Sequence, residues 1–168
     1  MMLSINWSNL NNVTPADVYF GRNIASAAIA AHECGHAVQH ARAYSMLQFR
    51  TALVPLQNIS AKIMNVIFTM MFFGVFLFNS FISIDFALYV IVACYAVFTL
   101  FAFVTLPVEI DASNRALMWL NSAGITGYGT HEKAKDALKW AAYTYVVAAL
   151  SSLAMLLYFL LMILGRRD

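Results

Sequence analysis

The sequence predicts an all-α membrane protein in which three transmembrane helices accompany a juxtamembrane helix that carries a His-Glu-x-x-His pattern. Hydrophobic residues make up 62% of the 168 residues and charged residues only 11%. Soluble domains average about 45–50% apolar and about 25% charged residues. Three runs are also apolar over the roughly 20 residues that a helix needs to cross a bilayer. We therefore expect one membrane-embedded domain over residues 1–168.

The N-terminal third of the chain is the polar part of the predicted protein. Residues 1–20 contain no Lys or Arg, so they lack the basic region of a signal peptide, and we expect internal segments to drive membrane insertion. Residues 21–44 are rich in Ala and free of Pro, which predicts a helix that packs closely on another one. This helix is too short, and too polar after Ala31, to cross a bilayer. Residues 45–62 predict an amphipathic helix with a kink or break at Pro55.

The three expected transmembrane helices cover residues 63–82, 84–106 and 140–164. The first and third runs carry no charge, and the second carries only Asp85 at its start. The link between the first two runs is short, which predicts a helical hairpin. Residues 121–130 are rich in Gly and predict a loop before the last helix.

Basic residues lie mainly on one side of these spans. Eight of the ten flank the hairpin or fill the segment after it, and two lie at the C-terminus. The positive-inside rule therefore places the polar segments in the cytoplasm. The formal charge of +2 gives no argument for a nucleic-acid partner. The eight residues are Arg22, Arg42, Arg50, Lys62, Arg115, Lys133, Lys135 and Lys139, against Arg166 and Arg167.

A short histidine motif contains the candidate metal ligands and the candidate general base. His32 and His36 are four residues apart, so they share one face of a helix and can bind one zinc ion. A catalytic zinc site leaves one coordination position for water, and Glu33 is placed to act as the general base. His40 continues the spacing, and it suits either a supporting role at the site or an ordinary place on a polar face.

A third metal ligand is expected in the segment that follows the second span. The hairpin returns the chain to the membrane face that it left, so Glu109 and Asp111 should lie beside the histidine helix. On a regular helix these two carboxylates point about 200° apart, so only one can face the metal. Pro107 suits the first turn of such a helix. We predict Glu109 as the ligand because of its longer reach, with Asp111 orienting the site or serving as the alternative ligand.

The motifs resemble a known family. The stretch GRNIASAAIAAHECGHAVQHARAY together with VTLPVEIDASNRAL resembles the YugP-like neutral zinc metallopeptidases, from about Val18 to the C-terminus. The resemblance implies a membrane-bound, Zn²⁺-dependent peptidase of prokaryotic type, located in the cell membrane. It implies His32 and His36 as ligands, Glu33 as base and an acidic residue of the 109–111 block as third ligand. Members of this family usually carry a longer N-terminal part.

The leading functional hypothesis is a zinc endopeptidase that acts on polypeptides at the cytoplasmic face of a lipid bilayer. The alternative is a catalytically silent metal-binding or chaperone-like membrane protein of the same fold. A third hypothesis, proteolysis within the membrane, requires the histidine helix to lie in the bilayer, and Arg22, Arg42 and Arg50 argue against that placement. The sequence sets neither the cleavage specificity nor the oligomeric state.

Overall fold

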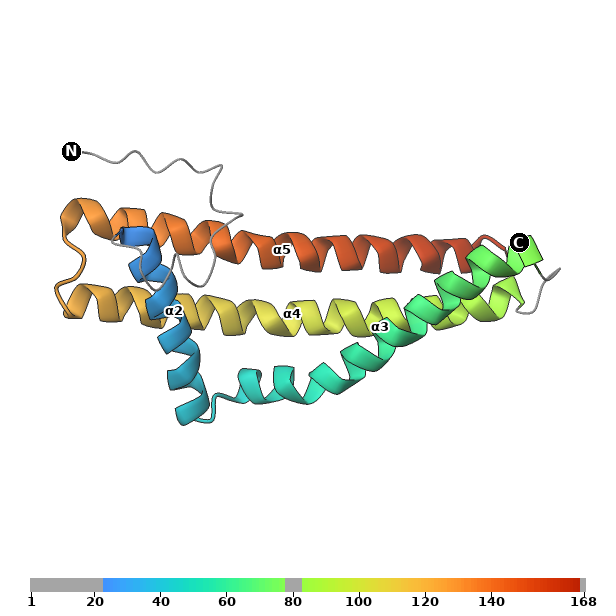
Figure 1. The fold of residues 1–168 in the computed structure, drawn as a ribbon, viewed down its shortest axis with the longest axis horizontal. Coiled ribbons are helices and arrows are strands. Elements are labelled where there is room, and N and C mark those ends of the chain that lie inside the picture. The colour runs from blue at the N-terminus through green and yellow to red at the C-terminus, as the bar shows by residue number, and fades with distance from the viewer. Residues whose placement is uncertain (1–22, 78–82, 167–168) are drawn as a thin grey trace. The chain divides into compact units, whose positions relative to one another are not determined.

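The computed structural model describes residues 23–77 and 83–166, and these residues form helices without any strand (Figure 1). The all-helical prediction is therefore confirmed for this part of the chain. The expected N-terminal segment, residues 1–20, lies outside the described residues. In chain order the described helices are α2 (Ile24–Ala41), α3 (Ser45–Leu77), α4 (Ile84–Ser122) and α5 (Tyr128–Leu164).

The helices pack in two compact units. Because α4 and α5 each run through both units, this division does not test the predicted single domain, which stays a prediction. The first unit combines α2 with the end of α4 from Ile110 and the start of α5 up to Ala141, and the second combines α3 with the start of α4 up to Glu109 and the rest of α5 from Ala142.

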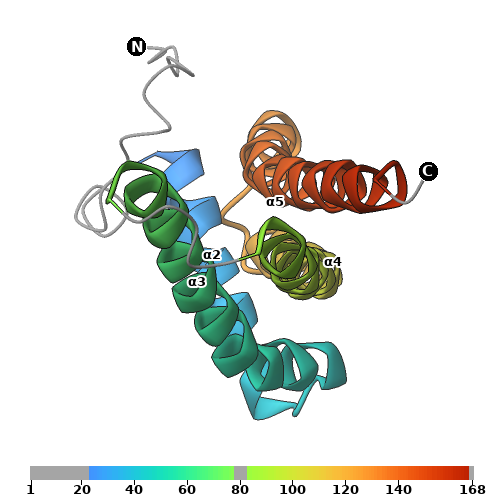
Figure 2. The same cartoon turned by 90° about the vertical axis from the view of Figure 1, so that its right-hand side faces the viewer.

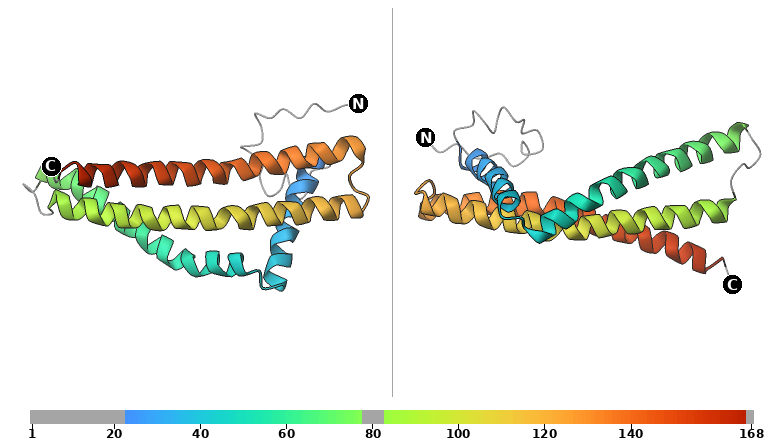
Figure 3. Two further views of the ribbon diagram at one scale, coloured as in Figure 1. Left: turned by 180° about the vertical axis from the view of Figure 1, so that it is seen from behind. Right: turned by 90° about the horizontal axis from the view of Figure 1, so that it is seen from below.

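The core of the first unit is built from small residues. In this unit α2 runs across the paired ends of α4 and α5 (Figures 1 and 3). Alanine side chains let the three backbones approach closely, which agrees with the close packing predicted for the Ala-rich helix. The buried cluster consists of Ala28 and Ala31 from α2, Ala116 and Leu120 from α4, and Ala134 and Leu138 from α5.

Hydrogen bonds between nearby residues define both ends of α2. Asn23 is the N-cap, and its side-chain oxygen accepts a hydrogen bond from the backbone N–H of Ser26 at 2.8 Å. At the other end Arg42 donates its backbone N–H to the carbonyl of Val38. The helix therefore begins and ends inside the predicted range 21–44.

The core of the second unit is built from larger side chains, and some of them are aromatic. Figure 2, which looks onto the end of this unit, shows α3, α4 and α5 as neighbouring helices. Tyr95 of α4 stacks on Phe159 of α5 with ring centroids 5.5 Å apart. The buried residues of this core are Met64 and Ile67 from α3 and Ala87, Ile91 and Cys94 from α4.

Within the described residues, two helices rather than the expected three are long and apolar enough to cross a membrane. These are α4 and α5, and both extend well beyond the expected spans of residues 84–106 and 140–164. The expected span 63–82 forms the second half of α3, and its last five residues lie outside the described part of the chain. Asn58, Lys62 and Asn65 interrupt the apolar residues of α3, and the described part of this helix ends at Leu77, before the expected span does.

Two prolines lie inside helices, which contradicts the helix start predicted at Pro107 and, of the predicted kink or break at Pro55, excludes the break. Pro107 does not start a helix, since α4 runs unbroken from Ile84 to Ser122. Pro55 likewise lies within α3, which continues beyond it although Figure 1 shows the helix changing direction in its first part. An internal proline removes one backbone hydrogen bond but does not end a helix whose flanks are apolar and well packed.

Candidate metal centre

The two histidines of the motif converge on one point. His32 and His36 lie one turn apart on α2, and their Nε2 atoms are 3.1 Å apart. Two nitrogens bound to one tetrahedral zinc at 2.0–2.1 Å lie about 3.3 Å from each other. The separation of the two ring nitrogens is therefore close to the value that a shared zinc ion requires.

A close backbone contact between α2 and α4 carries the histidines to their place. Gly35 is buried, and a Cβ atom built on it would lie 2.6 Å from the carbonyl oxygen of Ala112. Only glycine permits this approach, since real Cβ atoms do not come so near an oxygen. Gly35 lies between the two histidines in sequence, so the contact presses the metal-binding turn of α2 against α4.

Each histidine has a hydrogen-bond partner on its other ring nitrogen. The Nδ1 atom of His32 lies 3.1 Å from the hydroxyl of Ser113 on α4. The Nδ1 atom of His36 lies 2.9 Å from the side-chain oxygen of Gln39, three residues further along α2. Such partners hold an imidazole in one orientation and leave Nε2 to face the metal.

The partner of His36 leads into a network that reaches α4. The side-chain nitrogen of Gln39 donates to Asp111 Oδ2 at 2.8 Å, and Arg115 donates to the same carboxylate at 2.6 Å and 3.2 Å. Burial of the Asp111 carboxyl raises its pKa. The hydrogen bonds from Arg115 and Gln39 and the charge of Arg115 outweigh that effect, so the pKa of Asp111 lies below its ordinary value. Asp111 is thus held as a carboxylate.

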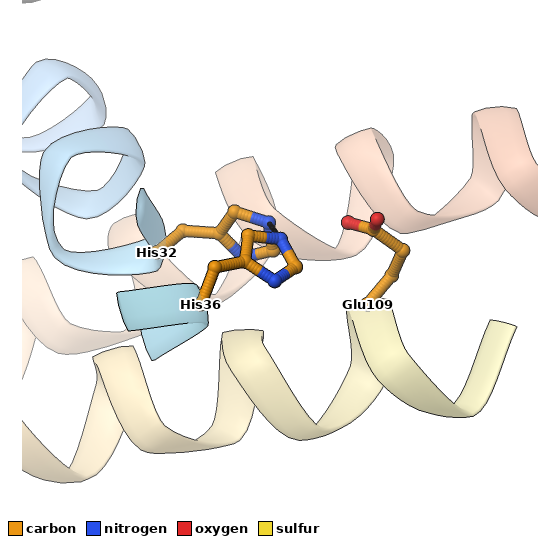
Figure 4. A group of neighbouring side chains, drawn as sticks. All are labelled: His32, His36 and Glu109. Carbon is orange, nitrogen blue, oxygen red and sulfur yellow. Dashed lines mark hydrogen bonds between the residues drawn. The ribbon is translucent and has the colours of Figure 1, made fainter. Parts of the chain in front are cut away.

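Glu109 is placed by the same helix. It is the last residue of the second unit, but one peptide bond of the unbroken α4 joins it to the first unit. It precedes Ala112 by three residues and Ser113 by four, so it shares their face, which contacts α2. Ligand atoms of His32, His36 and Glu109 all lie within 4.8 Å of one another, and Figure 4 shows the Glu109 carboxylate on α4 facing the two imidazoles of α2.

Comparisons with known proteins place the chain in one family. The family described as "putative neutral zinc metallopeptidase" matches residues 12–164, which include the whole site. The chain belongs to this family.

One curated member of the family comes from Bacillus subtilis (strain 168) and is named "Putative membrane protease YugP". It is 38% identical to this chain over 151 residues, which cover 90% of the chain. The chain spans 64% of the length of that relative. No solved structure matches the chain.

The residues at the site of this metallopeptidase-family member fit the zinc that the family name implies. Two neutral imidazoles and one carboxylate are a common ligand set of catalytic zinc, with a fourth position left open. Glu109 is only 3% exposed, so its carboxylate lies inside the protein, within 4.8 Å of the ring nitrogens of the two histidines. We therefore take these three residues as the candidate zinc ligands.

The remaining predicted site residues occupy different places. Glu33 is exposed on α2, and helix geometry puts it about 100° from His32 and about 60° from His36, beside the ligand face. His40 is exposed in the last turn of α2 and does not belong to the group of ligands. Asp111 is also outside that group, because it is engaged by Gln39 and Arg115.

Three residues that shape the site were not singled out in the sequence analysis. These residues are Gly35, Gln39 and Ser113. The spacing of Gln39 held a signal, since it lies three residues after His36 and seven after His32, on the same helix face. Gly35 and Ser113 gave no such signal, because their importance depends on contacts with residues far away in the sequence.

Proposed function

We propose that this protein is a membrane-bound, zinc-dependent endopeptidase whose active site lies at the cytoplasmic surface of the membrane. The observation that carries the proposal is the convergence of His32, His36 and Glu109 within 4.8 Å, next to an exposed glutamate in the His-Glu-x-x-His order. Family membership supports the same activity. The relative named a membrane protease supports the location.

The residues divide the work of hydrolysis among them. His32, His36 and Glu109 hold the zinc, which when bound polarises the peptide carbonyl and makes a water molecule more acidic. Glu33 takes the proton from the attacking water at its carboxylate and passes it to the leaving amine. The exposure of Glu33 leaves its carboxylate accessible to water and to a polypeptide substrate.

A membrane location is supported by apolar surface that the protein itself does not cover. Within the most apolar 18-residue stretch of each helix, only 11% of the residues of α5 and 33% of those of α4 are buried inside the protein. A soluble protein rarely leaves so much contiguous apolar surface in water. The exposed apolar residues in the second half of α5 include Val147, Leu150, Leu157, Tyr158, Leu161 and Leu164.

The decisive experiment compares metal content and hydrolysis in one preparation. The full chain is purified in detergent, its zinc is measured, and cleavage of an unfolded protein is followed for the wild type and for Glu33→Gln. We expect the variant to retain zinc and to lose 10²-fold or more of the hydrolysis, about the contribution of a general base. The matched control is Glu132→Gln, which alters an exposed glutamate on α5 that pairs with Lys135.

Two results would contradict the proposal. Cleavage by Glu33→Gln at the wild-type rate would exclude Glu33 as the base. Zinc binding without any hydrolysis by the wild type would favour the silent metal-binding protein. The control should match the wild type in both measurements.

A further inference from the structure

Gln39 is a buried polar side chain whose two ends face different partners. Its exposed fraction is 0%, and it is among the largest fully buried side chains of the described residues. Its oxygen lies 2.9 Å from Nδ1 of His36, and its nitrogen lies 2.8 Å from Oδ2 of Asp111. It therefore connects a candidate zinc ligand on α2 with a carboxylate on α4.

The carboxylate determines which way the amide points. An ionised carboxylate only accepts hydrogen bonds, so the NH₂ group of Gln39 must face Asp111. The Gln39 oxygen then faces His36 and can only accept, which requires the proton of the ring to be on Nδ1. Arg115 strengthens this order, because it donates to both oxygens of Asp111 and so uses them as acceptors.

We infer that Gln39 is a positioning residue that holds His36 in the tautomer with the proton on Nδ1 and the lone pair on Nε2. The inference deepens the proposed function, since this lone pair is the one that binds zinc. A ring with its proton on Nε2 presents no lone pair to the metal and must lose or move that proton first.

His32 provides a contrast within the same site. Its Nδ1 faces the hydroxyl of Ser113, which can either donate or accept by rotating about its C–O bond. With the lone pair of His36 on Nε2, the 3.1 Å contact between the two rings requires the proton of His32 to be on Nε2 in the metal-free protein. The tautomer of His36 is thus set by Gln39, whereas Ser113 lets His32 change tautomer when zinc binds.

The test reads the tautomers directly in the metal-free, full-length protein. Nitrogen NMR of ¹⁵N-histidine-labelled protein in detergent, at about pH 8.5 where ordinary histidines are neutral, distinguishes Nδ1–H from Nε2–H. The signals of each ring are assigned by their loss in His32→Ala and His36→Ala. We expect Nδ1–H for His36 and Nε2–H for His32 in the wild type.

The informative variant is Asp111→Leu, which removes both acceptor oxygens at similar volume. Arg115 Nε and the side-chain nitrogen of Gln39 donate to the same Oδ2 atom, so a variant that keeps an oxygen there would still orient the Gln39 amide. Without that acceptor, neither end of the Gln39 amide is favoured toward His36. We expect His36 to change from Nδ1–H alone to a mixture of the two tautomers. Zinc affinity, measured by competition with a chromophoric chelator, should fall about 10- to 100-fold.

Two further variants complete the test. Gln39→Met removes both hydrogen bonds at similar volume and should give His36 a mixture of tautomers and a comparable loss of zinc affinity. Asp136→Leu makes the same chemical change at an exposed position on α5 and should change neither measurement. Circular dichroism checks that each variant is folded.

The inference is wrong if metal-free wild type carries the His36 proton on Nε2, or if Asp111→Leu leaves the tautomers unchanged. A loss of zinc affinity with unchanged tautomers would assign Gln39 and Asp111 a purely structural role. Because the NMR measurement needs neither zinc nor hydrolysis, its failure is distinct from failure of the proposed peptidase activity.

Discussion

Glu109 and Asp111 lie two residues apart on α4, yet they have different neighbours. Glu109 is buried and lies in the group with His32 and His36, whereas Asp111 is partly exposed and bound by Gln39 and Arg115. Since a carboxylate already held by a guanidinium and an amide is poorly available to a metal, the structure favours Glu109 as the third ligand.

This assignment predicts a clear difference between two alanine variants. Glu109→Ala removes a ligand atom, so the purified protein should retain little zinc. Asp111→Ala removes only support for a ligand, so most of the zinc should remain at saturating concentration while hydrolysis falls. Equilibrium dialysis at one saturating zinc concentration measures the zinc bound by both variants. If Asp111→Ala loses the zinc and Glu109→Ala keeps it, Asp111 is the ligand.

At the scale of the elements, the crossing of α2 over α4 is the contact that positions the candidate ligands. The helices touch at Gly35 and Ala112, and the candidate ligands lie on either side of this contact. The 39 residues of α4 are about twice the number that crosses a bilayer, so the part after the apolar span is free to form one wall of the site. A single helix thus combines an apolar stretch long enough to cross a membrane with the surface that carries the candidate ligand Glu109.

Gly35→Ala should therefore impair both stability and metal binding. The new methyl group would meet the Ala112 carbonyl oxygen at 2.6 Å, which forces α2 away from α4. We expect a loss of about 1–3 kcal/mol in the free energy of unfolding, as for other overpacked cores, and weaker zinc binding. Thermal or denaturant unfolding in detergent and chelator competition measure these effects.

The control for this variant separates packing from helix propensity. In an open helix, replacing glycine by alanine stabilises by about 1 kcal/mol, so the intrinsic effect has the opposite sign. Ala37→Gly, on the exposed side of α2, measures that intrinsic term and should leave zinc affinity unchanged. A Gly35→Ala variant as stable as the wild type would show that the two helices can separate without cost.

At the scale of the whole molecule, the distribution of charge predicts the orientation in the membrane. Eight basic residues belong to the polar segments and only two to the C-terminal end. In the second unit one of those two, Arg166, is paired with Asp85 at 3.1 Å, which reduces its weight in the charge balance. The positive-inside rule thus favours a cytoplasmic site.

Thiol labelling of intact cells tests the orientation. In a Cys34→Ser background, which removes the exposed native thiol, Ser83→Cys should react with a membrane-impermeant reagent and Tyr128→Cys should not. Both positions are exposed in the structure, so protection reports the membrane rather than burial in the protein. Both variants should react after the membrane is permeabilised. The reverse pattern in intact cells would place the site outside the cytoplasm.

The sequence by itself determined the features that depend on local patterns. Apolar runs predicted α4 and α5 as spans, and four-residue spacing put His32 and His36 on one helix face, because hydropathy and helical period are properties of neighbouring residues. Only the tertiary structure decided that Pro107 lies within a helix and that Gly35 touches Ala112. It alone joined Gln39 to Asp111, 72 residues away. These features depend on which surfaces of distant segments meet, and no local pattern encodes that choice.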